Sequence, residues 1–245
     1  MDNTLFVGLS RQMVLRREMD IIANNIANAD TSGFKVESLM TKTEPKAPAT
    51  TFGAPPPVKF VTSDGVARDF SQGALRRTDA PFDVAIEGEG FFRVNGPEGE
   101  RYTRDGRFRM DEGGRLVTDN GSAVADDGGG EIVIDPEQGA VSISQDGVVS
   151  QNNQRIGKIG VFGFDNLSTL EKTGDNQYRN TSNQLAAPVT TAKLRQGMLE
   201  GSNVRPILEI TRMIEVSRAY ESMARLMESN SELSKSAVQR MGRIQ

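Results

Sequence analysis

ILEITRMIEVSRAYESMARLMESNSELSKSAVQRM, residues 207–241, is the longest stretch of the chain without proline or glycine. It predicts one amphipathic helix of about 50 Å, since a helix rises ~1.5 Å per residue. Opposite charges such as Glu221 and Arg225 support an exposed face. The apolar stripe has heptad spacing and comprises Met213, Val216, Tyr220, Met223, Met227, Asn230, Ser234, Ala237 and Met241. Asn and Ser dilute this stripe, and the helix is long for one small domain, so we expect it to contact other chains.

A second helix is predicted at the N-terminus, over residues 4–29. Its stripe is interrupted at Gly8 and Gln12 and otherwise consists of Leu5, Leu15, Met19, Ile22, Ile26 and Ala29. Gly33 marks the helix end, because glycine adopts the left-handed conformation at little cost. Two helices with heptad-like stripes can pair, so residues 1–36 and 200–245 are expected to form one coiled-coil-like domain.

The residues between the helices predict an inserted β-rich domain over 74–199. Short apolar segments alternate there with Asp105-Gly106, Asn120-Gly121 and Asp146-Gly147, which are strong hairpin signals. Residues 37–73 are expected to be an extended linker rich in proline and threonine, with five of the ten prolines between positions 45 and 57. The predicted fold class is therefore α+β, with discontinuous terminal helices and a mainly antiparallel β-domain between them.

Composition excludes several classes of function. The net charge of −4 argues against nucleic acid as a partner. With no histidine and no cysteine, zinc sites, thiol nucleophiles and histidine-based triads are excluded. No apolar run reaches the ~18 residues of a membrane-spanning helix, and the first residues lack the features of a cleaved signal peptide. We therefore predict no cofactor, no metal ion and no membrane span.

Two glycine- and aspartate-rich patterns resemble ligand sites without meeting their requirements. Gly88-Glu89-Gly90 lacks the further residues of a dinucleotide or phosphate loop, and we interpret it as a hairpin or bulge. Asp119-Asn120-Gly121 with Asp126 and Asp127 does not have the spacing of a calcium loop. Turn chemistry explains these aspartates without a metal.

Three ordered blocks of sequence resemble the signatures of the bacterial flagellar axial proteins. Ile22–Lys35 (IANNIANADTSGFK) resembles the N-terminal signature of that family. Phe82–Phe92 (FDVAIEGEGFF), continued by Tyr102–Gly106, resembles a block of the larger rod proteins and the hook protein. Leu199–Val204 and Met213–Glu221 resemble the C-terminal signature. The motif residues are Asn24, Asn25, Asn28, Gly33, Phe34, Gly88, Gly90, Phe91, Gly201 and Asn203.

The length and the single β-domain are similar to those of the flagellar basal-body rod proteins. Asn203-Val204-Arg205-Pro206 resembles the pattern of the proximal-rod type more than that of the distal-rod type. The resemblance implies a structural, non-enzymatic subunit that transmits torque from motor to hook. Its partners would be itself, the small proximal-rod subunits, the distal-rod protein and the type III export apparatus. Export without a cleaved signal would place it in the periplasmic part of the basal body.

The resemblance also implies that the terminal helices supply the contacts between subunits. The residues we expect at this assembly interface are Leu15, Met19, Ile22, Ile26, Met213, Val216, Tyr220, Met223 and Met227.

Two other classes of function remain open at this stage. One is a β-domain enzyme that acts on cell-wall polysaccharide through carboxylates near Asp83 and Glu87, as glycosidases do. The other is a dimeric or trimeric coiled-coil adaptor, which would form a discrete oligomer in solution. A rod subunit would instead be largely monomeric before assembly.

Overall fold

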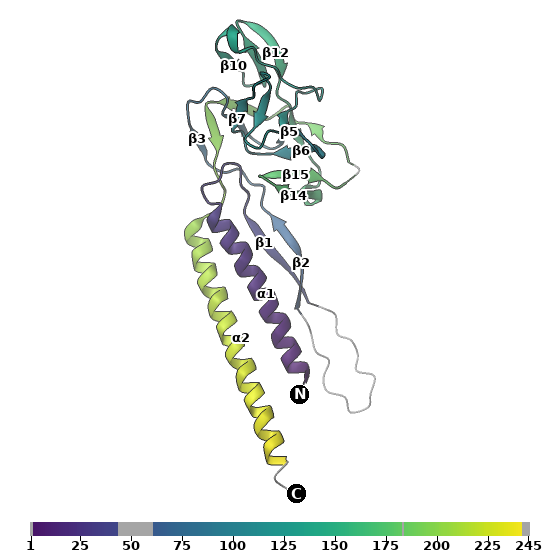
Figure 1. Ribbon diagram of the computed structural model, residues 1–245, viewed down its shortest axis with the longest axis vertical. Coiled ribbons are helices and arrows are strands. Elements are labelled where there is room, and N and C mark those ends of the chain that lie inside the picture. The colour runs from purple at the N-terminus through teal and green to yellow at the C-terminus, as the bar shows by residue number, and fades with distance from the viewer. Residues whose placement is uncertain (1, 44–60, 183, 242–245) are drawn as a thin grey trace. The chain divides into compact units, whose positions relative to one another are not determined.

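The computed structural model describes residues 2–43, 61–182 and 184–241, and the chain forms two compact units (Figure 1). The helical unit consists of Met1–Ala27, Glu37–Arg68 and Arg205–Gln245. The β-unit consists of Asn28–Val36 and Asp69–Val204. Helices at both ends with antiparallel strands between them confirm the predicted α+β class.

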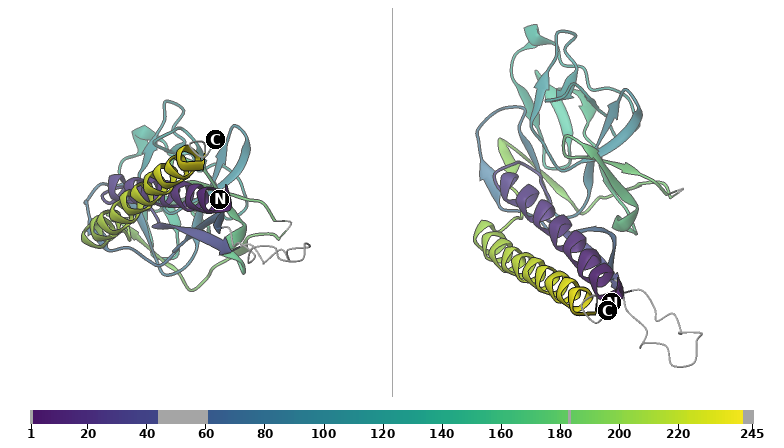
Figure 2. Two further views of the ribbon diagram at one scale, coloured as in Figure 1. Left: turned by 90° about the horizontal axis from the view of Figure 1, so that it is seen from below. Right: turned by 60° about the horizontal axis from the view of Figure 1, so that its bottom comes forward.

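Two long helices dominate the helical unit. Helix α1 spans Asp2–Ala27 and helix α2 spans Pro206–Met241. They lie side by side in Figure 1 and in the right view of Figure 2. Pro206 opens α2, where a missing N–H removes no helical hydrogen bond. Gly8, which interrupts the stripe of α1, has a steric purpose. A Cβ at Gly8 would lie 3.0 Å from Cγ of Met227, so glycine allows the two helices to approach closely.

A two-stranded antiparallel hairpin accompanies α1 in the helical unit. Strand β1 spans Glu37–Thr43 and strand β2 spans Val61–Arg68, with a register shift between Met40 and Thr41. The expectation of an extended linker is wrong for these two segments. Glu37 is buried while Ser38 and Met40 are exposed, which is the alternation of a strand with one covered face. The five prolines between 45 and 57 lie outside the described residues.

The β-unit contains one large antiparallel sheet and several smaller sets of paired strands. Among the described residues, nine strands form the large sheet in the order β14-β15-β6-β5-β9-β8-β7, with β13 bridging β5 and β16. Its strands are β5 (Phe91–Gly96), β6 (Gly99–Thr103), β7 (Phe108–Met110), β8 (Leu116–Thr118), β9 (Ala123–Val124), β13 (Val161–Gly163), β14 (Leu170–Gly174), β15 (Gln177–Asn180) and β16 (Ala187–Pro188).

The remaining strands pair in smaller sets. A three-stranded sheet contains β10 (Val141–Ile143), β11 (Val148–Gln151) and β12 (Gln154–Lys158). Short 3-10 helices occur at Pro136–Gln138 and Leu167–Thr169. Strand β3 (Leu75–Arg77) pairs with β18 (Met198–Glu200), and β4 (Val84–Glu87) pairs with β17 (Lys193–Gln196). The last strands of the unit are therefore hydrogen-bonded to its first ones.

Two apolar clusters make up the core of the β-unit. The larger cluster includes Val84, Ile86, Phe92 and Val149, each of which is fully buried. The second cluster is aromatic and consists of Phe91, Tyr102, Phe162, Leu170 and Tyr178. Edge-to-face pairs hold it together, with 5.4 Å between the ring centroids of Phe70 and Phe91. The β-unit thus has a core of its own.

Candidate functional site: the assembly interface

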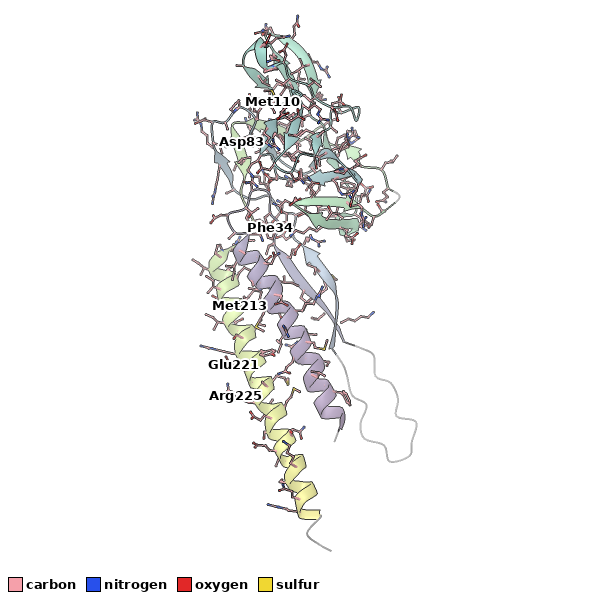
Figure 3. The ribbon with its side chains drawn as sticks, viewed as in Figure 1. Phe34, Asp83, Met110, Met213, Glu221 and Arg225 are labelled. Carbon is pink, nitrogen blue, oxygen red and sulfur yellow. The ribbon has the colours of Figure 1, made fainter. Side chains whose placement is uncertain are left out.

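The contact between α1 and α2 is an apolar seam with a small buried centre. Leu15, Ile22 and Val216 are buried there, and Met19, Ile26, Met213 and Tyr220 pack around them. Met223 and Met227 lie beside Gly8 at the same contact. Figure 3 labels Met213, Glu221 and Arg225 in succession along α2. The heptad-like stripes of the sequence therefore identified the faces through which α1 and α2 contact each other.

All nine residues predicted for the assembly interface lie in this seam, where they contact one another within the chain. A heptad stripe shows which face of a helix is buried, but not whether the partner belongs to the same chain. The role of these residues in contacts between subunits stays a prediction. Within the single chain their role is to join the two helices.

A different set of large apolar side chains is left exposed on both helices. On α1 the residues Phe6, Leu9 and Met13 follow a spacing of three and four, as one face of a helix requires. On α2 the exposed residues include Ile207, which is 80% exposed. The full set, which we call the outer apolar residues, is Phe6, Leu9, Met13, Ile207, Leu208, Ile210, Ile214, Leu226 and Leu233. Exposed apolar residues gathered on one element are typical of a surface that becomes covered in an assembly.

Asn25 is the centre of a buried hydrogen-bond network in the helical unit. Its Nδ2 donates to the carbonyl oxygen of Glu37 at 2.7 Å, and its Oδ1 accepts from the Glu37 amide at 3.0 Å. Nδ2 also donates to Oε2 of Glu209 at 2.9 Å. Arg68 in turn pairs with Glu37 at 2.9 Å. One asparagine thereby joins α1, β1 and α2, and its side chain is completely buried.

We expect Asn25→Ala to lower the stability of the helical unit by about 2–4 kcal/mol, because it leaves several buried polar groups without partners. Urea unfolding followed by circular dichroism at helix wavelengths measures this change. The exposed residue Asp20 of the same helix provides the control, and Asp20→Ala should change stability by less than about 0.5 kcal/mol. Equal effects of the two substitutions would show that the network does not stabilise the unit.

The β-unit contains a buried cluster of three charged side chains. Nζ of Lys35 lies 2.5 Å from Oε1 of Glu200, and NH1 of Arg104 lies 3.1 Å from Oε2 of Glu200. The side chains of Lys35 and Glu200 are 0% exposed and that of Arg104 is 3% exposed. Lys35 also donates to the carbonyl oxygen of Ser71, and the amide of Gly73 donates to Glu200. We call these three residues the charged cluster.

Burial shapes the electrostatics of the charged cluster. Removal from water lowers the pKa of the Lys35 ammonium below its usual value, and the carboxylate of Glu200 opposes that shift. Burial lowers the pKa of Arg104 for the same reason, and Glu200 again acts in the opposite direction. A buried ion pair contributes little net stability compared with apolar residues, but losing one member is costly. The cluster therefore enforces one arrangement of three distant segments.

Two motif residues place these segments next to one another. Gly33 has φ +69°, and a Cβ there would lie 2.5 Å from the amide nitrogen of Asp105, so only glycine fits. Its amide donates to the carbonyl oxygen of Glu200 at 2.8 Å. Asn203 accepts from the Val36 amide at 2.8 Å and donates to the carbonyl oxygen of Asp69 at 2.8 Å. The N-terminal and C-terminal signatures are thus bonded to each other directly.

The other motif residues have structural positions as well. Phe34 and Phe91 are buried, and Gly201 donates its amide to the carbonyl oxygen of Ala74. Asn28 accepts from the hydroxyl of Thr31 just after α1 ends, and Asn24 is exposed. Gly90 has φ +117° and lies against Val161. Gly88-Glu89-Gly90 forms a bend between β4 and β5. The predicted hairpin is not formed there, because β4 pairs with β17 while β5 pairs with β6, β9 and β13.

The two acidic residues considered for catalysis make structural contacts within the β-unit. Asp83 forms an isolated β-bridge with Arg107, while Glu87 forms an exposed ion pair with Arg195 at 2.7 Å. Oδ1 of Asp126 accepts from the amides of Gly128 and Gly130, as turn chemistry predicts. Across the described residues, no group of three or more acidic side chains could hold a metal ion. In the same part of the chain, no helix is long and apolar enough to cross a membrane.

Sequence reasoning missed the buried charges Lys35, Arg104, Glu200 and Glu209. Lys35 and Glu200 lie inside the quoted signatures, but charged residues are rarely buried. The two residues bind each other although they are 165 positions apart in the chain. One signal in the sequence could have indicated this burial. Lys35 directly follows the motif residue Phe34, and Glu200 directly precedes the motif residue Gly201.

Comparison with known proteins identifies the family. Residues 85–151 match the family described as flagellar hook protein FlgE/F/G D1 domain. Residues 195–240 match the flagellar basal body rod FlgEFG protein C-terminal family, and residues 5–35 match the flagella basal body rod protein family. These matches coincide with the three signature blocks.

Full-length relatives agree with these matches. The flagellar basal-body rod protein FlgF of Caulobacter vibrioides is 58% identical over 100% of both chains. The FlgF protein of Mesorhizobium japonicum is 37% identical over 99% of both chains. The FlgG protein of Buchnera aphidicola (Schizaphis graminum) is 34% identical over 92% of this chain and 94% of its own length. The chain therefore belongs to the flagellar basal-body rod protein family, as a structural subunit and not an enzyme.

Proposed function

We propose that this protein is a proximal-rod subunit that assembles through the outer apolar residues of α1 and α2. The single observation behind this proposal is that both helices keep large apolar side chains exposed after they have packed against each other. Removing apolar surface from water contributes about 25 cal/mol per Å². Contacts between neighbouring subunits would bury this surface and join the chains into a shaft.

The proposed mechanism is mechanical and requires no chemistry. Contacts between unlike surface patches of successive subunits do not close on themselves, and they therefore generate a helical filament. A closely packed interface has low compressibility and transmits strain. These properties suit a shaft that carries torque from motor to hook. The two buried networks would keep each subunit's segments in one arrangement under that load.

The proposal includes the partners and the route to the basal body. The neighbours would be further copies of this chain, the small proximal-rod subunits and the distal-rod protein. Export by the flagellar type III apparatus, without a cleaved signal peptide, would deliver the chain to the periplasmic part of the rod. The family membership and the Asn203–Pro206 pattern support this placement.

An Ile214→Asp variant tests the proposed surface. Ile214 is 48% exposed, so the isolated protein should keep its helicity and its thermal melt. A carboxylate in a buried contact between subunits would be strongly unfavourable, and we expect cells with this variant to lack complete rods and to be non-motile. Ile214→Leu is the matched control and should assemble normally. Normal basal bodies in the Ile214→Asp strain would contradict this interface.

A further inference from the structure

The outer apolar residues include two separate patches, one on each helix of the helical unit. The patch on α1, which we call the α1 patch, consists of Phe6, Leu9 and Met13. The patch on the first turns of α2, which we call the α2 patch, consists of Ile207, Ile210 and Ile214. In both patches the residues are spaced three and then four apart, so each patch is a short stripe along its helix.

The two patches lie at opposite ends of the pair of helices. Nδ2 of Asn25 donates to Oε2 of Glu209 at 2.9 Å, so the start of α2 is level with the end of α1. Gly8 lies against Met227, so the start of α1 is level with the second half of α2. The helices are therefore antiparallel (Figure 1). The two patches are about 15 residues apart along the pair, or ~22 Å at a rise of about 1.5 Å per residue.

Both patches point away from the seam between α1 and α2. Leu9 directly follows Gly8, which faces α2, and Ile210 directly follows Glu209, which faces α1. Each residue of a helix is rotated by ~100° from the one before it, so a residue that follows a seam position points outward. The distance between the patches also prevents them from covering each other. Both consequently stay exposed in the single chain.

The exposed charges beside the patches favour one direction of pairing between the two patches. In a parallel pairing, Arg17 would lie beside Arg218, and both are exposed. Asp20 would lie beside Glu221 in the same arrangement, and like charges on facing helices repel each other. An antiparallel pairing separates these charges. It also brings the exposed Glu215 level with the first turn of α1, whose free N–H groups carry a partial positive charge.

The area of the patches suits a contact that is repeated along an assembly. Six half-exposed side chains provide roughly 600 Å² together, which is below the ~1,200 Å² of a stable complex. One such contact does not hold a discrete dimer. A copy of the chain, however, supplies the counterpart of both patches, so the contact can be repeated in series. A different protein on one patch would leave the other patch exposed.

We propose that the α1 patch of one copy packs antiparallel against the α2 patch of the next copy, which is displaced by ~22 Å along the helices. Because unlike surfaces meet, the contact is heterologous and does not close on itself. The flexible side chain of Met13 can adapt to the branched isoleucines that it meets. This inference rests on the function proposed above, and it adds the neighbour and the register of the contact.

Cysteine cross-linking of the purified full-length chain tests this pairing, because the chain contains no cysteine of its own. Chains with Leu9→Cys and chains with Ile210→Cys are mixed and oxidised with copper phenanthroline, which traps transient contacts as disulfides. The matched control is a mixture of Leu9→Cys with Leu226→Cys, since Leu226 is another exposed apolar residue of α2. We expect about fivefold more cross-linked dimer in the first mixture, because the contact raises the effective concentration of the two thiols.

A chain with both Leu9→Cys and Ile210→Cys should form a ladder of species larger than a dimer on a non-reducing gel, because each copy bonds to one copy on either side. Adding Ile214→Asp should remove the ladder. Equal yields from the two mixtures would overturn the proposal, and so would a double variant that stops at the dimer.

Failure of this pairing is distinguishable from failure of the proposed function. If no cross-link forms while Ile214→Asp strains lack rods, a different rod protein covers the α2 patch. The pairing of copies is then wrong and the rod function stands. If Ile214→Asp strains assemble normal rods, the helical interface itself is wrong, and the pairing fails with it.

Discussion

Glu200→Ala lowers the free energy of unfolding of the β-unit by about 3–5 kcal/mol, because it leaves two buried cations without the carboxylate that they share. Lys35 and Arg104 both bond to Glu200, and their side chains have almost no contact with solvent. The amide of Gly73 loses its acceptor in the same substitution. This is the largest stability effect that we expect from any single polar residue of the β-unit.

Chemical denaturation followed by near-ultraviolet circular dichroism measures this loss, since Tyr102 and Tyr178 lie in the aromatic core of the β-unit. Glu171→Ala is the matched control. Glu171 pairs with Arg179 at 2.7 Å, but both side chains are about half exposed, and such pairs contribute less than about 1 kcal/mol. If Glu200→Ala destabilised the protein no more than Glu171→Ala, the charged cluster would have to be hydrated in solution.

Tyr220→Asp abolishes incorporation into the rod and leaves the β-unit folded. Tyr220 packs against the buried centre of the α1–α2 seam, beside Val216. An aspartate there loses the apolar contact of the ring and brings an unpaired carboxylate into the seam, which together costs about 3–5 kcal/mol. Among the described residues, the buried centre of the seam consists of Leu15, Ile22 and Val216. A loss of that size is therefore enough to separate the helices.

Isolation of basal bodies and a motility assay report the loss of incorporation, and helix circular dichroism reports the separation. Met223→Asp, at the close approach of α2 to Gly8, should behave in the same way. Tyr220→Phe keeps the ring and should assemble normally. A thermal melt in which Tyr220→Asp also destroys the β-unit would mean that the seam belongs to the core of the whole chain.

The sequence predicted the elements whose signals are local. Both helices and their seam follow from a period that holds over many turns, and the strands follow from turns such as Asp146-Gly147. The hairpin of β1 and β2 was missed because its few residues adjoin a stretch rich in proline and threonine, which obscures a short alternation. Its inner face is recognisable only once Asn25 is seen to bond to Glu37.

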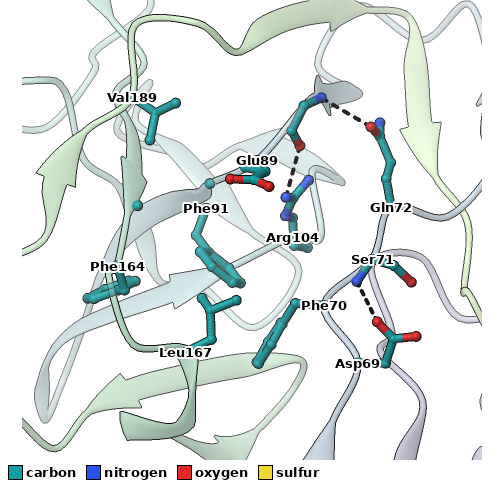
Figure 4. A pocket seen from close by; sticks show the side chains of 13 residues that line it. Asp69, Phe70, Ser71, Gln72, Glu89, Phe91, Arg104, Phe164, Leu167 and Val189 are labelled. Carbon is teal, nitrogen blue, oxygen red and sulfur yellow. Dashed lines mark hydrogen bonds between the residues drawn. The ribbon is translucent and has the colours of Figure 1, made fainter.

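Long-range chemistry could not be predicted from the sequence. Nothing local to Lys35 indicates that Glu200 neutralises it, since the two residues meet only in the folded unit. The pocket of the β-unit that Phe70, Glu89 and Phe164 line could not be predicted for the same reason, because these residues come from separate segments of the chain (Figure 4). The seam shows a third limit, since periodicity identifies the buried face of a helix without identifying its partner.

The pairing of β17 and β18 with β4 and β3 controls when the β-unit can be completed. A chain synthesised from its N-terminus must first expose residues 193–200 before these pairs and the bonds of Glu200 can form. Non-local pairing of this kind also slows folding. The β-unit is consequently completed only after residues 193–200 have been synthesised, and the order of its strands encodes that delay.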